Sequence, residues 1–300
     1  MAVYKKTYRP YDGGLTAQWS RFLVIPRYAF EDLHRSRFLT IFFIASFIYP
    51  LIGAIIIWLQ HNASALGLFG AQGANRLITI NVVFFLSLLG WQSMLALFLA
   101  AFVGPGQVSP DLANNGLALY LARPFSRTEY VLGKMSVLVL LLSLMTWVPG
   151  LLLFGLQGYL EGWQWMSDNL RFATAMFFGA WIWILVLSLL ALALSAWVKW
   201  KPAAGALMFG VFFVGAAFGA IINGVQRTNW GYMFNIGYVV GSIWVQLFEG
   251  ANKTTNGAVF FRVPQGEELP MWCSWMALAG LCGVCLYMLA RKIRGTEVVR

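Results

Sequence analysis

The sequence predicts an all-α, polytopic membrane protein with six transmembrane helices. Of its 300 residues, 60% are hydrophobic and only 11% are charged, a balance far from that of a water-soluble domain. A helix crosses the ~30 Å hydrocarbon core of a bilayer with about 20 apolar residues. Six apolar runs are long enough, and we expect a six-helix transmembrane domain at 39–290, with spans at 39–60, 80–103, 131–156, 172–198, 203–225 and 272–290.

Lysine and arginine fall mainly on one side of the membrane when the spans are placed in this way. Sixteen of the 21 lie in 1–38, in the second-to-third and fourth-to-fifth connections, and in the basic tail 291–300. Loops rich in Lys and Arg stay in the cytoplasm, and an even number of spans puts both termini on one side. We therefore expect a multi-pass protein of the inner (plasma) membrane with both termini cytoplasmic. The net charge of +10 then requires no nucleic-acid partner.

The cytoplasmic N-terminal segment, 1–38, contains an amphipathic pattern. Leu15, Trp19 and Phe22 recur at intervals of four and three residues with Arg21 between them, and Pro26 interrupts the pattern. We expect an amphipathic elbow helix in the membrane interface, with its basic side chains toward lipid headgroups. The alternative is a solvated tail.

The connection between the second and third spans is the most structured polar segment of the sequence. Residues 104–106, Gly-Pro-Gly, are expected to end the second span. Ser109 then suits the N-cap of a short cytoplasmic helix, with Asp111 at the positive end of its dipole. Ser126 and Glu129 form a capping box that opens the third span. The pattern predicts a rigid helix between the two spans.

The connection between the fifth and sixth spans, 226–271, contains an apolar stretch, 236–248, that is too short to cross the bilayer. A seventh span here would place the basic C-terminus outside, against the distribution of Lys and Arg. We therefore expect a re-entrant or interfacial outer segment. Four aromatic residues are expected to anchor it at the interface: Trp230, Tyr232, Tyr238 and Trp244.

Charged residues are missing from the middle of the expected spans, and only Lys134 falls inside one, near its cytoplasmic end. Pumps and ion-coupled transporters normally keep such groups at mid-membrane, so a secondary transporter is disfavoured. The sequence also contains no G-x-x-x-x-G-K-[ST] loop, because Gly133 and Lys134 lack its upstream Gly and its Ser or Thr. We expect a chain that is not an enzyme; if the protein works against a gradient, a partner must supply the energy.

Cysteine and histidine offer few ligands for a metal or cofactor. Cys282 and Cys285 form a C-x-x-C within the sixth span, where small apolar residues of a lipid-embedded helix are the favoured interpretation over a redox or metal site. His34 and His61 both lie near the ends of spans, so bis-histidine haem ligation inside the bilayer has no candidates. We expect neither a metal nor a cofactor on this chain.

The fifth span contains a G-x-x-x-G pair, Gly215 and Gly219. Such pairs allow two membrane helices to approach closely. The pattern favours contact with a second subunit and ordinary packing within the chain about equally, and both interpretations remain open here.

The stretch 117–134, LALYLARPFSRTEYVLGK, resembles the loop between spans two and three of ABC-2 type transporter permeases. The approach to the first span, RYAFEDLHRSRFLT at 27–40, is also similar to that family. The number of spans, the amphipathic elbow and the long last outer loop extend the resemblance over nearly the whole chain. The resemblance implies two permease subunits, identical or different, above two separate ATP-binding cassette subunits.

In that family the loop between spans two and three is the coupling helix to the ATPase. The resemblance therefore implies that Asp111, Arg123, Arg127 and Glu129 take part in ATPase coupling. It also implies that the permease forms the substrate pathway of an exporter. A membrane anchor or assembly subunit that transports nothing is the alternative function.

Overall fold

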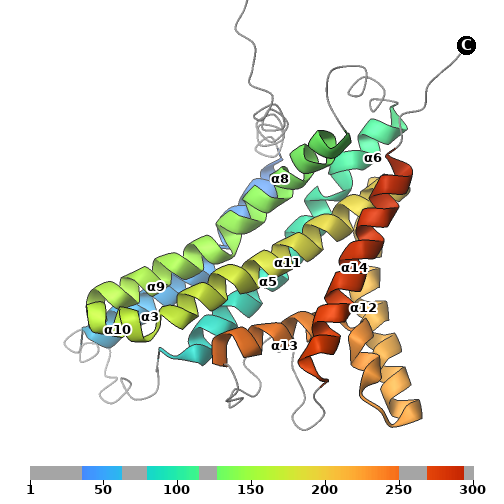
Figure 1. Ribbon diagram of the computed structural model, residues 1–300. Coiled ribbons are helices and arrows are strands. Elements are labelled where there is room, and N and C mark those ends of the chain that lie inside the picture. The colour runs from blue at the N-terminus through green and yellow to red at the C-terminus, as the bar shows by residue number, and fades with distance from the viewer. Residues whose placement is uncertain (1–35, 63–79, 115–126, 250–268, 294–300) are drawn as a thin grey trace, which may run out of the picture.

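The computed structural model describes residues 36–62, 80–114, 127–249 and 269–293, and all regular secondary structure in these ranges is helical (Figure 1). The expected N-terminal elbow helix and most of the tail 291–300 lie outside them. The helices, in chain order, are α2 (Arg37–Ala45), α3 (Ile48–His61), α5 (Val82–Val103), α6 (Pro105–Ala113), α8 (Arg127–Met145), α9 (Trp147–Glu161), α10 (Trp163–Asp168), α11 (Leu170–Trp197), α12 (Lys201–Gln226), the 3₁₀ helix η3 (Trp230–Phe234), α13 (Ile236–Glu249) and α14 (Met271–Lys292).

Six helical runs are long and apolar enough to cross a membrane, which confirms the predicted number and indicates a multi-pass membrane protein. Each run overlaps one predicted stretch, and the second and third extend furthest beyond theirs. The runs are Arg37–His61, Val82–Ala113, Arg127–Glu161, Leu170–Trp197, Lys201–Gln226 and Met271–Lys292.

The first and third runs are each broken one turn before a proline. Pro50 has no N–H for the carbonyl of Ser46, and the helix is interrupted between Ala45 and Ile48. The amide of Gln92 in α5 donates to that carbonyl at 3.1 Å, inside the protein. Pro149 follows the second break, at Thr146, whose hydroxyl donates to the carbonyl of Leu142 at 2.7 Å. Both interruptions therefore have a local cause in the sequence.

Helix α11 is the centre of the packing and contacts α5, α6, α8, α9, α12, α13 and α14. Its Trp183 is fully buried and donates its indole N–H to the carbonyl oxygen of Ser93 at 2.9 Å. The same ring meets Phe212 of α12 and Trp244 of α13 edge to face, with centroids 5.5 Å and 5.9 Å apart. Aromatic contacts of this kind join the fourth span to the elements on either side.

Helix α13 packs against α11 and α14 and lies beside the lower end of α14 in the view of Figure 1. It has 14 residues, which agrees with the expected short apolar segment. The prediction of four interfacial anchors is wrong for two of them, because Tyr238 and Trp244 are buried in the protein, at 3% and 0% exposed. Trp230 is exposed, as an anchor would be. An aromatic pattern alone does not distinguish a ring facing lipid from one facing protein.

Candidate functional site

The second-to-third connection begins differently from the prediction. Gly104 has helical backbone angles and Pro105 is the first residue of α6, so that Val82–Ala113 forms one nearly continuous helical run. Gly104, Pro105 and Gly106 therefore do not end the helix. Proline at a first helical position loses no hydrogen bond, which explains why the Gly-Pro pair is tolerated.

Ser195 of α11 fastens the start of α6 to the fourth span. Its hydroxyl oxygen accepts from the backbone N–H groups of Val108 and Ser109, at 3.1 Å and 2.9 Å. Its own proton goes to the carbonyl oxygen of Pro105, at 2.9 Å. The hydroxyl is fully buried, so these three bonds satisfy backbone groups that water cannot reach.

Ser109 is not an N-cap, contrary to the prediction, because it lies within α6 and is fully buried. Its hydroxyl lies 2.9 Å from the carbonyl oxygen of Val198 and 2.6 Å from that of Lys199. These two carbonyls belong to the turn between α11 and α12, where the helical ladder has ended. Helix α6 is thereby attached to the fourth-to-fifth connection as well as to the fourth span.

The backbone at Gly104 approaches α11 very closely. A Cβ atom at this position would lie 2.5 Å from the Cβ of Ala191 and 2.6 Å from the carbonyl oxygen of Ala100. Real Cβ atoms do not approach other heavy atoms so closely, so only glycine fits without movement of the helices. The α5–α6 junction is held against α11 without a gap.

Asp111 joins the other end of α6 to the third span. One of its carboxylate oxygens, Oδ2, lies 2.9 Å from the ammonium nitrogen of Lys134 and accepts from the hydroxyl of Tyr130 at 2.7 Å. Tyr130 is fully buried, and the Asp111 and Lys134 side chains are 19% and 12% exposed. The predicted role at a helix N-terminus is wrong, because Asp111 lies in the last turn of α6. Asp111 instead forms an ion pair with Lys134 of α8.

The remaining predicted coupling residues lie around the start of α8. Arg127 is its first described residue and is exposed, and Glu129 is half-buried in the first turn, where its charge complements the helix dipole. Arg123 and Ser126 lie outside the described residues, so the proposed capping box stays a prediction. The structure brings Asp111 close to α8 and leaves Arg127 open to solvent at the same end.

The glycine pair of the fifth span packs within the chain. A Cβ at Gly215 would lie 2.6 Å from the carbonyl oxygen of Phe234, and one at Gly219 would overlap that of Gly231. Asn223 of α12 also accepts from the N–H of Gly231, at 2.7 Å. Of the two interpretations of the G-x-x-x-G pattern, the structure thus provides the contact for internal packing, between α12 and η3. A contact between subunits through these two glycines stays a prediction.

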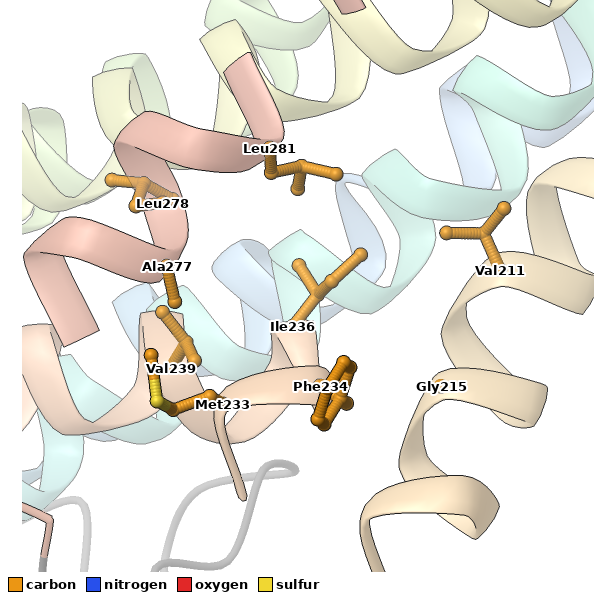
Figure 2. Close-up of a pocket in the computed structure, with 9 residues that line it drawn as sticks. All are labelled: Val211, Gly215, Met233, Phe234, Ile236, Val239, Ala277, Leu278 and Leu281. Carbon is orange, nitrogen blue, oxygen red and sulfur yellow. The ribbon is translucent and has the colours of Figure 1, made fainter. Parts of the chain in front are cut away.

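An apolar pocket of about 260 Å³ lies beside this contact (Figure 2). It is formed by α12, η3, α13 and α14, with Val211, Met233 and Leu278 among the side chains around it. The lining residues carry no charge, so the pocket suits hydrocarbon rather than an ion. No group of three or more potential metal-ligating His, Cys, Asp or Glu side chains is found among the described residues.

Sequence reasoning missed Ser195, Tyr130 and the packing role of Ser109. A serine within an apolar run carries no signal of its partner, and Tyr130 was part of the family-like stretch without an assigned role. Comparison with known proteins adds no assignment: no protein-family model matches the chain, and no curated protein matches it. The resemblance to ABC-2 type permeases therefore rests on the motifs themselves.

Proposed function

We propose that the chain is the membrane-spanning permease subunit of an ABC transporter of the ABC-2 type, in which α6 and the start of α8 transmit the movement of a separate ATP-binding cassette subunit. The observation that carries this proposal is the attachment of α6 to three spans. Ser195 and Ser109 bind it to the end of α11 and the turn before α12, and Asp111 binds it to α8. A force on α6 would therefore reach spans three, four and five together.

The positions of basic residues support a cytoplasmic location for this end of the bundle. Seven described Lys and Arg residues lie at the ends of helices on the α6 side: Arg37, Arg127, Lys134, Lys199, Lys201, Arg291 and Lys292. Only Arg171 and Arg227 lie at the opposite helix ends among the described residues. By the positive-inside rule, α6 and both termini face the cytoplasm of the inner membrane.

The proposal includes a second permease subunit, identical or different, and export as the direction of transport. The deciding experiment is purification of the tagged chain from native membranes at low detergent, with quantification of the proteins that accompany it. A stoichiometric ATP-binding cassette protein, lost when α6 is altered, is the expected result. Copurification with a membrane complex that contains no such ATPase would overturn the proposal and favour the anchor or assembly function.

Reconstitution separates binding from transport. The purified complex in vesicles is expected to hydrolyse ATP faster than the ATPase alone, because α6 links nucleotide-driven closure to the spans. If the ATPase binds but its rate is independent of the permease and of every lipid or drug tested, the chain is a membrane anchor for that ATPase. The two functions therefore give different results in one preparation.

A further inference from the structure

Exposed basic side chains gather where the end of α14 meets the turn between α11 and α12. Trp197, the last residue of α11, joins the two sides of this meeting. Its indole N–H donates to the carbonyl oxygen of Met288 in α14 at 3.2 Å. The ammonium nitrogen of Lys292 lies 5.4 Å from the centre of a tryptophan ring, that of Trp197, which is an attractive cation–π geometry. The basic cluster of this region comprises four exposed residues: Lys199, Lys201, Arg291 and Lys292.

The basic cluster has an excess of positive charge. Within the described ranges, no ion pair joins any of its members to an acidic side chain. On the same side of the bundle, Asp111 of α6 holds Lys134 of α8 at 2.9 Å, and Glu129 lies in the first turn of α8. Trp200, between two of the lysines in the chain, is 71% exposed. Exposed tryptophan together with basic residues is typical of the headgroup level of a membrane.

Away from the basic cluster, α12 and α14 diverge toward the other side of the membrane (Figure 1). The apolar pocket of about 260 Å³ lies between them, with Val211 of α12 and Leu281 of α14 on opposite sides of it (Figure 2). Val214 and Met276, on the same two helices, are 67% and 60% exposed. The pocket is therefore bordered by apolar side chains that the hydrocarbon of a bilayer would cover.

The pocket lies one leaflet away from the basic cluster. Lys201 and Val211 are ten residues apart in α12, a rise of about 15 Å. Leu281 and Lys292 are eleven residues apart in α14, a rise of about 17 Å. One leaflet, half of a hydrocarbon core of ~30 Å, is also about 15 Å thick. A lipid whose headgroup lies at the basic cluster therefore has a tail long enough to end in the pocket.

We propose that the basic cluster and the apolar pocket together bind one anionic phospholipid from the leaflet on the α6 side. The phosphate is held by the lysine and arginine side chains, and the end of one acyl chain fills the pocket between α12 and α14. Basic sites between membrane helices bind anionic headgroups. The pocket lining carries no charge, so a hydrocarbon chain enters it without leaving a charged group desolvated.

Other occupants fit these two features less well. The pocket is smaller than the ~300–1,000 Å³ of sites for drug-sized ligands, and its lining side chains offer no polar group to orient such a ligand. A free phosphate would use the basic cluster alone and leave the pocket unused. A second copy of the chain, in the same membrane orientation, would bring four more cations to the same depth, which is unfavourable.

The test uses the purified full chain in detergent with phosphatidylglycerol that carries a photoreactive diazirine at the end of one acyl chain. After illumination, labelled residues are mapped by mass spectrometry. Label is expected on α12 and α14 around Val211 and Leu281. Phosphatidylcholine with the same tail has no net charge and is expected to label these positions several-fold less. Equal labelling by the two lipids, or label spread evenly over the exposed helix faces, would overturn the proposal.

A pair of charge variants at the two ends of α12 tests the headgroup site. Lys201→Gln removes one cation of the basic cluster, and Arg227→Gln removes an exposed cation from the opposite end of the helix. One basic residue near a headgroup contributes about 1 kcal/mol, so labelling at limiting phosphatidylglycerol should fall about fivefold in Lys201→Gln. It should not change in Arg227→Gln. An equal change in the two variants, or none in either, would contradict the headgroup site.

A pair of bulky substitutions on α14 tests the pocket. Ala277→Phe places a ring in the pocket, and Ala279→Phe places the same ring on the exposed face of the helix. Label near Val211 and Leu281 should be lost in Ala277→Phe and kept in Ala279→Phe. Label kept in both variants would contradict the tail site. Crosslinking of Val211 to a second copy of the chain, in place of lipid labelling, would assign the pocket to a subunit contact and overturn the proposal.

Thermal unfolding separates a lipid from a soluble phosphate. Phosphatidylglycerol is expected to raise the melting temperature, whereas glycerol phosphate, which has the phosphate and no tail, should not raise it at the same concentration. Equal stabilisation by the two compounds would assign the basic cluster to a soluble phosphate and contradict the lipid. None of these measurements uses ATP or transport, so their outcome is independent of the proposed function.

Discussion

Trp244 of α13 donates its indole N–H to the carbonyl oxygen of Gly179 in α11, with 2.9 Å between nitrogen and oxygen. The tryptophan is fully buried. Arg171, near the start of α11, donates to two carbonyl oxygens near the C-terminal end of α13. These belong to Gln246 and Leu247, at 3.0 Å and 2.9 Å. A cation at the negative end of the α13 dipole is favourable. The C-terminal half of α13 is therefore fixed to the fourth span.

Trp244→Phe is expected to destabilise the protein. The carbonyl of Gly179 loses its side-chain partner, and the smaller phenyl ring leaves a space where the indole was. The loss should be about 1–3 kcal/mol in the free energy of unfolding. Thermal unfolding in detergent measures it. Trp230→Phe is the matched control, since Trp230 is 52% exposed and should change little. Equal effects of the two substitutions would show that α13 is not fixed through Trp244.

Ser195→Ala should loosen α6, because the N–H groups of Val108 and Ser109 and the carbonyl of Pro105 lose their shared partner. Removing one member of a buried hydrogen-bond group costs about 1–3 kcal/mol. Hydrogen–deuterium exchange is expected to increase within 105–113. Ser188→Ala, on the same helix, is the control, since its hydroxyl is buried with no hydrogen-bond partner among the described residues. If exchange in α6 is equal in the two variants, Ser195 does not hold the helix.

Gly219→Ala should separate α12 from η3, because the added methyl group meets the carbonyl of Gly231. Overpacking of this kind costs about 1–3 kcal/mol. Gly224→Ala, five residues further along α12, meets nothing within 4 Å and should be neutral or slightly stabilising. Unfolding and subunit crosslinking are measured together. Normal stability with weakened crosslinking in Gly219→Ala would instead assign the glycine to a contact between subunits.

Arg127→Glu should weaken binding of the proposed ATP-binding cassette subunit without affecting membrane insertion, because the side chain is exposed at the start of α8. Arg227→Glu, exposed at the far end of α12, makes the same change in charge on the opposite side. Copurification of the ATPase is expected to fall several-fold in the first variant only. An equal loss in both would mean that overall charge, rather than the α6–α8 end, governs the association.

The sequence predicts the spans well, because a run of about twenty apolar residues fits few structures other than a membrane-spanning helix. We predicted no break in the first or third span, although Pro50 and Pro149 indicate one in each, because each lacks the N–H that would bond the carbonyl four residues earlier. The start of α6 was misjudged because Gly-Pro-Gly suggests a break, whereas Pro105 occupies a position where helices accept proline. Ser195 could not be assigned from sequence, because its partner Ser109 is 86 residues away in the chain.

The second helical run, Val82–Ala113, is longer than the hydrocarbon core of a bilayer is thick. Its 32 residues rise about 48 Å at ~1.5 Å each, whereas the hydrocarbon core is ~30 Å thick. Even with an average tilt of ~20° the rod is about 15 Å too long for the hydrophobic layer. The third run, with 35 residues, exceeds the hydrophobic layer by about 19 Å on the same basis. On the proposed topology, α6 forms the last turns of this second run and lies at headgroup height beyond the acyl chains, where a water-soluble partner could reach its last turn.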